Sequence, residues 1–139
     1  MNDVSIDWRK AWREGLAPQL TTRGLEVLKL ALASDDPRLL QGATTMQAPM
    51  QCVAGWAVEA ACVIGYCGWQ GKGLKWVGDV EEYFATVCYE ADQALGVQAG
   101  CRTFLAWYDE TPRDEMRRQL LAEVGRALTG RLRQGPSLS

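Results

Sequence analysis

The sequence predicts an all-α fold, a single compact domain of five or six helices around a buried central helix at about residues 50–66. Residues 50–66, MQCVAGWAVEAACVIGY, are apolar on nearly every side and carry one charge, Glu59. A helix that is hydrophobic all round is wrapped by other helices. Elsewhere, apolar residues recur every three or four positions, and glycines, prolines and capping residues separate these periodic segments.

Length and composition agree with one soluble domain. The chain has 139 residues, of which 47% are hydrophobic and 23% charged, and its net charge is −2. We expect a single helical domain over residues 1–133 and a disordered tail at 134–139. The acidic balance makes general nucleic-acid binding unlikely, because such domains are usually basic.

Neither a membrane span nor a leader is predicted. The apolar run from Cys52 to Cys67 is interrupted by Glu59 and is too short to cross a bilayer. The polar N-terminus lacks the apolar region of a signal peptide. We therefore expect no membrane partner and a cytoplasmic location.

The first half of the chain predicts two helices before the central one. Residues 4–14 place Trp8 and Trp12 on one helical face. Thr21 or Thr22 can cap a second helix that runs to about Ala33. The residues expected in its buried stripe are Leu25, Val27, Leu28, Leu30, Ala31 and Leu32. Residues 34–37, SDDP, are a stop and turn signal.

The second half predicts a loop and three helices. Four glycines within residues 67–78 favour a long loop or a short hairpin. A helix over 79–95, ended by Gly96, and a shorter one over about 97–108 follow. Thr111 as N-cap and Pro112 as the first helical residue begin the last helix. Its expected buried residues are Met116, Leu120, Leu121, Val124, Ala127 and Leu128.

The five cysteines form no C-x-x-C pair, and the chain has no histidine. This excludes histidine-based triads and gives no recognisable metal-ligand spacing, so we expect no metal and no cofactor. Reduced, buried thiols are the favoured interpretation. Cys52, at the start of the predicted central helix, is the best candidate for a reactive thiol.

The glycine-rich segment 67–78 is a candidate ligand site. Trp69 and Trp76 flank Lys72 and Lys75, and flat aromatic faces beside cations can stack a base and neutralise its phosphate. The alternative is that both indoles fold onto the core, which is how most tryptophans of a small domain are used.

Glu59 is the other candidate, either as a ligand contact or as a general base with a raised pKa, with Asp109 as a second carboxylate. The interpretation that we favour is a structural role, in which Glu59 is buried and accepts hydrogen bonds. A carboxylate pair without a nucleophile or metal is weak support for catalysis. We therefore assign no catalytic residue and favour a non-enzymatic protein.

Opposite charges gather on different predicted helices. The last helix is rich in arginine, whereas the helix at 79–95 carries Asp79, Glu81, Glu82, Glu90 and Asp92. Such a distribution suits self-association or contact with another protein. More often, charges of this kind form solvated faces.

Four short segments resemble a loose group of small uncharacterised helical proteins of phages and bacterial genomes. That group carries a Q-G segment, a C-x-x-G-x-A helix, an A-x-x-L-G turn and an L-x-x-x-N-D segment. The matching positions are Gln41, Gly42, Cys52, Gly55, Leu95, Gly96, Leu105 and Asp109. Tyr108 stands where the group has asparagine, and the glycine-tryptophan loop is an insertion. The resemblance implies an origin in a mobile element and no particular activity.

We therefore expect a non-enzymatic binding protein, a phage accessory or counter-defence factor acting on a host protein. One alternative is a small-ligand or nucleotide binder that uses residues 67–78. A further alternative is an enzyme that uses Glu59 and Asp109.

Overall fold

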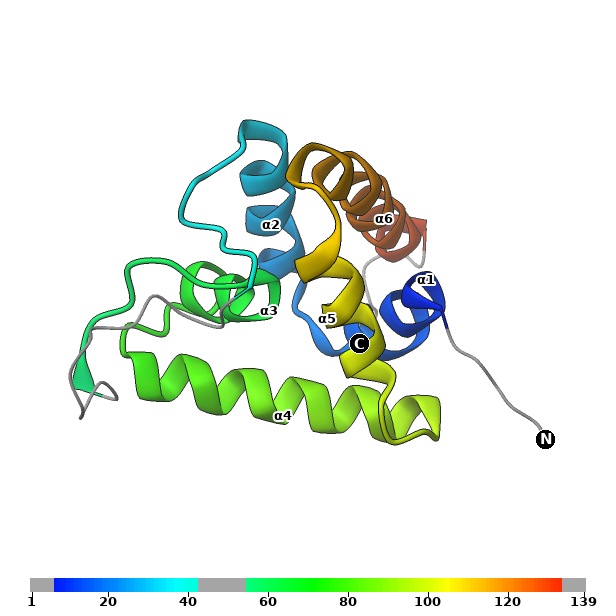
Figure 1. Cartoon of the computed structure of the whole chain (residues 1–139), viewed down its shortest axis with the longest axis horizontal. Coiled ribbons are helices and arrows are strands. Elements are labelled where there is room, and N and C mark those ends of the chain that lie inside the picture. Colours follow the sequence, from blue (N-terminus) through cyan, green and yellow to red (C-terminus); the bar gives the residue numbers. More distant parts are fainter. Residues whose placement is uncertain (1–6, 43–54, 134–139) are drawn as a thin grey trace.

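The computed structural model describes residues 7–42 and 55–133, and it confirms an all-α, single compact domain. Within these residues there are six α-helices, α1–α6, and no β-strand. Helix α4 (Val77–Leu95) runs along one side of the molecule, and α2 (Thr22–Ser34) and α6 (Arg113–Arg133) lie on the side away from it (Figure 1). Helices α3 (Val63–Tyr66) and α5 (Gly100–Glu110) lie between these two sides.

The N-terminal segment is helical from Trp8 onward. Helix α1 (Trp8–Lys10) continues into a wider π-helical stretch, η1 (Ala11–Leu16), and a 3-10 turn, η2 (Ala17–Gln19). The Asp7 carboxylate caps its start by accepting from the Lys10 backbone N–H at 2.8 Å. Trp8 and Trp12 are both buried, which confirms the predicted common face.

Helix α2 begins and ends at the predicted signals. The Thr21 hydroxyl accepts from the Gly24 backbone N–H at 2.9 Å, and Asp35 ends the helix in the left-handed conformation. The stripe was predicted correctly except at Leu30, which is 67% exposed. On a helical wheel Leu30 lies opposite the direction shared by Leu25, Leu28 and Leu32, so its exposure follows from the 3.6-residue period.

The predicted central helix at 50–66 is wrong for the residues that the structure describes. Only Val63–Tyr66 are α-helical, and residues 57–62 run in an extended, irregular conformation. Their backbone bonds with distant segments: Ala61 N–H donates to the Arg38 carbonyl at 2.8 Å and Val58 N–H to the Lys75 carbonyl at 2.9 Å. Residues 50–54 lie outside the described residues.

The extended conformation also corrects the prediction that Glu59 is buried. Neighbouring side chains of an extended chain point to opposite sides. Val58 and Ala60 are accordingly buried, whereas Glu59 between them is exposed. The apolar run does enter the core, but through an alternating pattern and the short helix α3, not as one long helix.

The glycine-rich segment is only partly a loop. Residues Cys67–Gly71 prolong α3 as a π-helical stretch, η4, and the chain is irregular only from Lys72 to Trp76. Its glycines allow close packing: a Cβ on Gly68 would lie 2.6 Å from the Tyr83 ring, and one on Gly71 would lie 2.6 Å from Gly24 Cα. These glycines therefore permit helix contact where the sequence pattern indicated helix breaking.

The C-terminal half follows the predicted order of helices. Helix α4 ends at Gly96, whose φ of 71° is the left-handed conformation typical of a C-terminal cap. Helix α5 begins at Gly100, three residues later than predicted, and α6 begins at Arg113. The Thr111 hydroxyl donates to the Trp107 carbonyl at 2.6 Å, so it satisfies a carbonyl in the last turn of α5.

An aromatic cluster joins the N-terminal segment to α5 at the centre of the core. The rings of Trp8 and Trp107 stack with centroids 3.6 Å apart, and Trp12 lies 5.4 Å from Phe104. Phe104 in turn lies 6.1 Å from Tyr108, and all of these side chains except Trp107 are buried. Aromatic contacts of this kind contribute beyond the area they bury.

Cys88 of α4 and Cys101 of α5 form a disulfide, so the prediction of five free thiols is wrong. Thirteen positions separate the two cysteines in the sequence, and the turn between α4 and α5 brings their Cα atoms to 5.5 Å. Cys62 and Cys67 are free and buried, as expected. Disulfides are rare in the cytosol, so the cysteines no longer support a cytoplasmic location.

No helix within residues 7–42 and 55–133 is long and apolar enough to cross a membrane. The predicted tail at 134–139 lies outside the described residues, as does Cys52.

Candidate functional site

The four residues of the predicted loop site have different neighbours in the structure. Trp69 is half-buried in η4, with its ring edge-on to Tyr66 at 5.9 Å and the Arg38 guanidinium 5.4 Å above it. Lys72 lies 5.8 Å above the ring of Tyr83 on α4. Each of these two side chains thus has an aromatic or cationic partner from within the protein.

Trp76 and Lys75 are exposed and pair through their backbone with residues 56–58. Trp76 is 49% exposed and forms an isolated antiparallel bridge with Ala57. This bridge brings Trp56, which is 50% exposed, close to Trp76 along the backbone, because Val77 N–H donates to the Trp56 carbonyl at 2.8 Å. Lys75 is exposed and contributes its carbonyl to the same backbone pairing.

A polar cluster holds Arg38 and the turn after α2 against α3. Arg38 donates to both carboxylate oxygens of Asp36, the shortest bond being 2.7 Å, and the Tyr66 hydroxyl donates to Asp36 at 3.0 Å. The Arg38 hydrogen bonds hold the Asp36 pKa well below its usual range. Burial, together with Asp36, raises the Tyr66 pKa to about 12. The charges of Arg38 and Asp36 neutralise each other within the cluster. We therefore assign the cluster a structural role, in which it holds the turn after α2 against α3.

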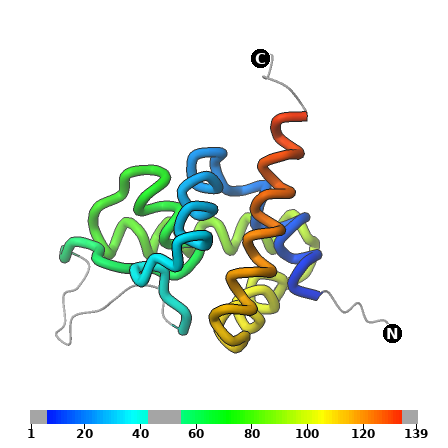
Figure 2. The backbone as a smooth tube through the Cα atoms, turned by 90° about the horizontal axis from the view of Figure 1, so that it is seen from above, coloured from blue at the N-terminus to red at the C-terminus, as the bar shows by residue number. Residues whose placement is uncertain are grey.

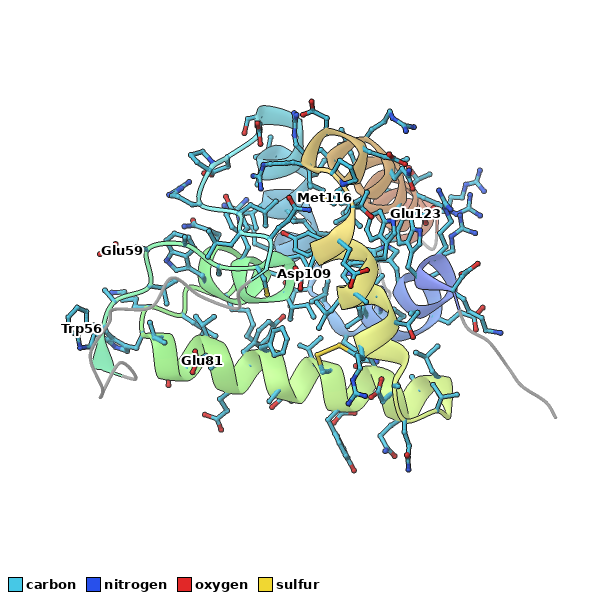
Figure 3. All side chains as sticks on the ribbon, viewed as in Figure 1. Trp56, Glu59, Glu81, Asp109, Met116 and Glu123 are labelled. Atoms are coloured by element: carbon cyan, nitrogen blue, oxygen red, sulfur yellow. A yellow bond between two sulfur atoms is a disulfide. The ribbon has the colours of Figure 1, made fainter. Side chains whose placement is uncertain are left out.

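Glu59 and Asp109 do not form a carboxylate pair. Figure 3 shows Glu59 at the outer edge of the molecule, above the α3 side, and Asp109 near its middle, on α5. Both side chains are exposed. Asp109 accepts a hydrogen bond from the Gly42 backbone N–H at 2.7 Å.

The segment at residues 40–42 contacts the C-terminal end of α5. The Gln41 side-chain amide donates to the carbonyls of Tyr108 and Thr111 at 2.7 and 2.9 Å, and Gly42 bonds with Asp109. The Tyr108 hydroxyl donates to the Leu40 carbonyl. These bonds fasten residues 40–42 to the C-terminal end of α5, which gives the Q-G segment a structural role.

The free thiols are poor nucleophiles. Burial raises the pKa of Cys62 to about 11, and it raises the pKa of Cys67 as well. A thiol in such surroundings stays protonated at neutral pH. In the described part of the chain no three His, Cys, Asp or Glu side chains are grouped so that they could hold a metal ion.

A groove between α2 and α6 is an open apolar feature that the sequence did not indicate. The two helices are antiparallel, because Arg117 donates to the Leu32 carbonyl at 2.9 Å while Arg131 donates to Thr22 Oγ1 at 3.1 Å. The groove has a volume of about 600 Å³. Its lining residues are Thr22, Arg23, Glu26, Lys29, Leu30, Leu128, Arg131 and Leu132. Figure 2 shows the C-terminal part of α6 projecting past the rest of the fold.

Two exposed leucines stand in this groove. Leu30 is 67% exposed and Leu132 is 81% exposed, and they come from different helices. Three cations, Arg23, Lys29 and Arg131, share the lining with a single carboxylate, Glu26. The groove is therefore apolar with a positive rim, in a chain whose net charge is −2.

The sequence interpretation missed this groove for two reasons. It assigned Leu30 to the buried stripe, although its position on the helical wheel was a usable signal. Leu132 lies in the last turn of a predicted helix, where periodicity cannot distinguish a core residue from an exposed one. Only the packing of α6 against α2 places both leucines on the same surface.

Comparison of the chain with protein-family models, with curated proteins and with solved structures found no significant match in any of the three.

Proposed function

We propose that this chain is a non-enzymatic binding protein that holds an amphipathic helix of another protein in the α2/α6 groove. The observation that carries the proposal is the pair of highly exposed leucines, Leu30 and Leu132, on facing walls of one groove. Helix-in-groove recognition uses apolar anchors spaced by three, four or seven residues, which fill such a groove along its length.

Charge specifies the chemistry of the partner helix. Arg23 is 4.0 Å from Glu26, so that pair is largely compensated within the rim. Lys29 has no ion-pair partner among the described residues, and Arg131 bonds only neutral oxygens. A helix with apolar anchors flanked by aspartate or glutamate complements this rim. If the chain derives from a mobile element, as the resemblance implies, the partner belongs to the host.

The test uses two synthetic helical peptides with the same leucine stripe, one flanked by glutamates and the other by lysines. We expect the acidic peptide to bind the full chain in fluorescence anisotropy at least tenfold more tightly than the basic one. Leu132→Ser and Leu30→Ser should each weaken binding of the acidic peptide. Tyr89→Ser is the matched control, because Tyr89 is 62% exposed but lies on α4.

Two results would overturn the proposal. The first is equal binding of both peptides, or equal loss of binding in all three serine variants. The second is a concentration-dependent dimer in sedimentation experiments that Leu132→Ser abolishes. That dimer would assign the groove to a second copy of this chain.

A further inference from the structure

A second cavity lies between the N-terminal helical segment and α6, beside the α2/α6 groove. Its inner part, about 190 Å³, is lined by Trp12, Arg13, Ala17, Glu123, Arg126 and Ala127. Its outer part, about 410 Å³, shares four of these residues and adds Pro18, Gly130 and Arg131. The inner part alone exceeds the share of liquid volume taken by several water molecules, about 30 Å³ each.

A fully buried tryptophan, Trp12, forms part of the wall of the inner part. The indole N–H of Trp12 is buried and has no hydrogen-bond acceptor among the described residues. Trp12 is fully buried, so its N–H does not face the space that a ligand would fill. Its side chain belongs to the wall of the cavity and can therefore report on what binds beside it.

The cavity is positively charged. Arg13, Arg126 and Arg131 line its two parts together with one carboxylate, Glu123, which leaves two uncompensated positive charges. Arg13 neutralises Glu123 through two bonds of 2.8 Å. Arg126 makes no hydrogen bond or ion pair within residues 7–42 and 55–133, and it lines both parts.

Arg131 lacks a carboxylate partner. Its guanidinium donates to the carbonyls of Ala17 and Leu20 at 2.9 and 2.7 Å and to Thr22 Oγ1. These bonds fix its position without cancelling its charge. Burial lowers its pKa, yet an arginine stays protonated at neutral pH, so the charge remains available to an anion.

We propose that this cavity binds the phosphate group of a small phosphorylated molecule. Arg126 supplies an exposed guanidinium, and Arg13 and Arg131 supply fixed positive charge. Phosphate monoesters carry nearly two negative charges at neutral pH, which matches the net charge of the lining. The small residues Ala17, Pro18 and Gly130 leave room for the rest of the molecule. The cavity adjoins the proposed helix-binding groove and shares Arg131 with it, whereas Arg126 lines only the cavity.

The test follows the indole N–H resonances of the full, ¹⁵N-labelled chain by NMR. The Trp12 resonance is assigned from a Trp12→Phe spectrum. Inorganic phosphate and glycerol 3-phosphate are titrated at constant ionic strength, with chloride as the reference anion. We expect a saturable shift of the Trp12 resonance with phosphate and with the monoester. If the rest of the molecule occupies the outer part, glycerol 3-phosphate should bind more tightly than inorganic phosphate. Equal binding of the two would mean that the site takes free phosphate.

Arg126→Gln should weaken phosphate binding about tenfold, because it removes a charge-assisted donor. Arg118→Gln is the matched control: it removes the same charge from an exposed position of α6 that does not line the cavity. Its phosphate affinity should stay within about twofold of the parent. A Trp12 resonance that chloride moves as far as phosphate does, or that phosphate does not move, would overturn the proposal. Equal weakening in both variants would do the same.

Discussion

Arg13 and Glu123 form two hydrogen bonds of 2.8 Å that join residues 110 positions apart in the sequence. Arg9 Nε lies 3.5 Å from the same carboxylate. The bonds fasten the N-terminal helical segment to α6, and Glu123 is the only buried charged residue in the described part of the chain. Bidentate arginine–carboxylate pairs are among the strongest hydrogen-bonded contacts in proteins.

This pair makes stability depend on pH. Hydrogen bonding by Arg13 lowers the Glu123 pKa below its ordinary value. A lowered folded-state pKa contributes stability that is present above the unfolded pKa, about 4.3, and is lost as the pH falls through the folded pKa. We expect Glu123→Gln to lower the free energy of unfolding by about 1–3 kcal/mol at pH 7.

Urea unfolding of parent and variant from neutral to acidic pH measures this effect. The difference between them should shrink below the ordinary glutamate pKa, because the parent then loses the same charge. Glu110→Gln, at an exposed position of α5, should match the parent throughout. A difference that does not change with pH would contradict an ionic role for Glu123.

The disulfide predicts a thiol count. Two of the five cysteines are bonded, so a denatured, unreduced sample should show three reactive thiols. Cys62 and Cys67 should not react in the native protein, because they are buried and their pKa values are raised. Five thiols in the denatured, unreduced sample would show that Cys88 and Cys101 are reduced.

The same bond should contribute to stability. It closes a loop of about 14 residues, for which the chain-entropy model gives about 3 kcal/mol. We expect the Cys88→Ala, Cys101→Ala double variant to unfold at lower temperature than the parent. Dithiothreitol should lower the melting temperature of the parent to a similar extent and leave the double variant unchanged.

Gly71 and Gly125 should respond to alanine in opposite directions. A Cβ on Gly71 would lie 2.6 Å from Gly24 Cα, which is backbone and cannot rotate away. We expect Gly71→Ala to cost about 1–3 kcal/mol by overpacking. Gly125 lies within α6 with no atom in the way, so Gly125→Ala should stabilise by about 0.5–1 kcal/mol. Thermal melts of both variants check the pair, and a neutral Gly71→Ala would show that η4 moves freely away from α2.

Glu59→Ala should leave stability within about 0.5 kcal/mol of the parent, because the side chain is exposed on an extended segment. Chemical denaturation of the single variant is sufficient. A loss well beyond that range would mean that Glu59 has a buried partner after all.

Helices whose ends are marked locally could be predicted from the sequence. Thr21 and Asp35 bound α2, and Gly96 ends α4, because a cap or a left-handed residue acts through its own backbone neighbours. The buried face of α6 was predicted in part in the same way: Met116, Leu120 and Val124 are buried, whereas Leu121, Ala127 and Leu128 are only partly buried. Periodicity reports burial along one helix and needs no knowledge of its partner.

Of the candidate site, the sequence supplied the residue types but not their neighbours. Trp69 and Lys72 have the chemistry of a ligand site, yet one packs with Tyr66 and the other with Tyr83. The groove and the arginine-lined cavity each need α6 packed against a segment from the first quarter of the chain. No local pattern indicates that Leu30 and Leu132 line the same groove, or that Trp12 and Arg126 line the same cavity.

The sequence by itself determined an all-α domain, the order of its helices and the ends of α2 and α4. Tertiary structure alone decided the conformation of the apolar run, because Val58 and Ala61 bond to Lys75 and Arg38 instead of to carbonyls four residues back. It also decided the disulfide, since Cys88 and Cys101 meet only when α4 and α5 turn back on each other. An apolar segment is stable in any conformation in which its backbone N–H and C=O groups are hydrogen-bonded. Here the hydrogen-bond partners lie far away in the sequence, so periodicity along the segment does not reveal them.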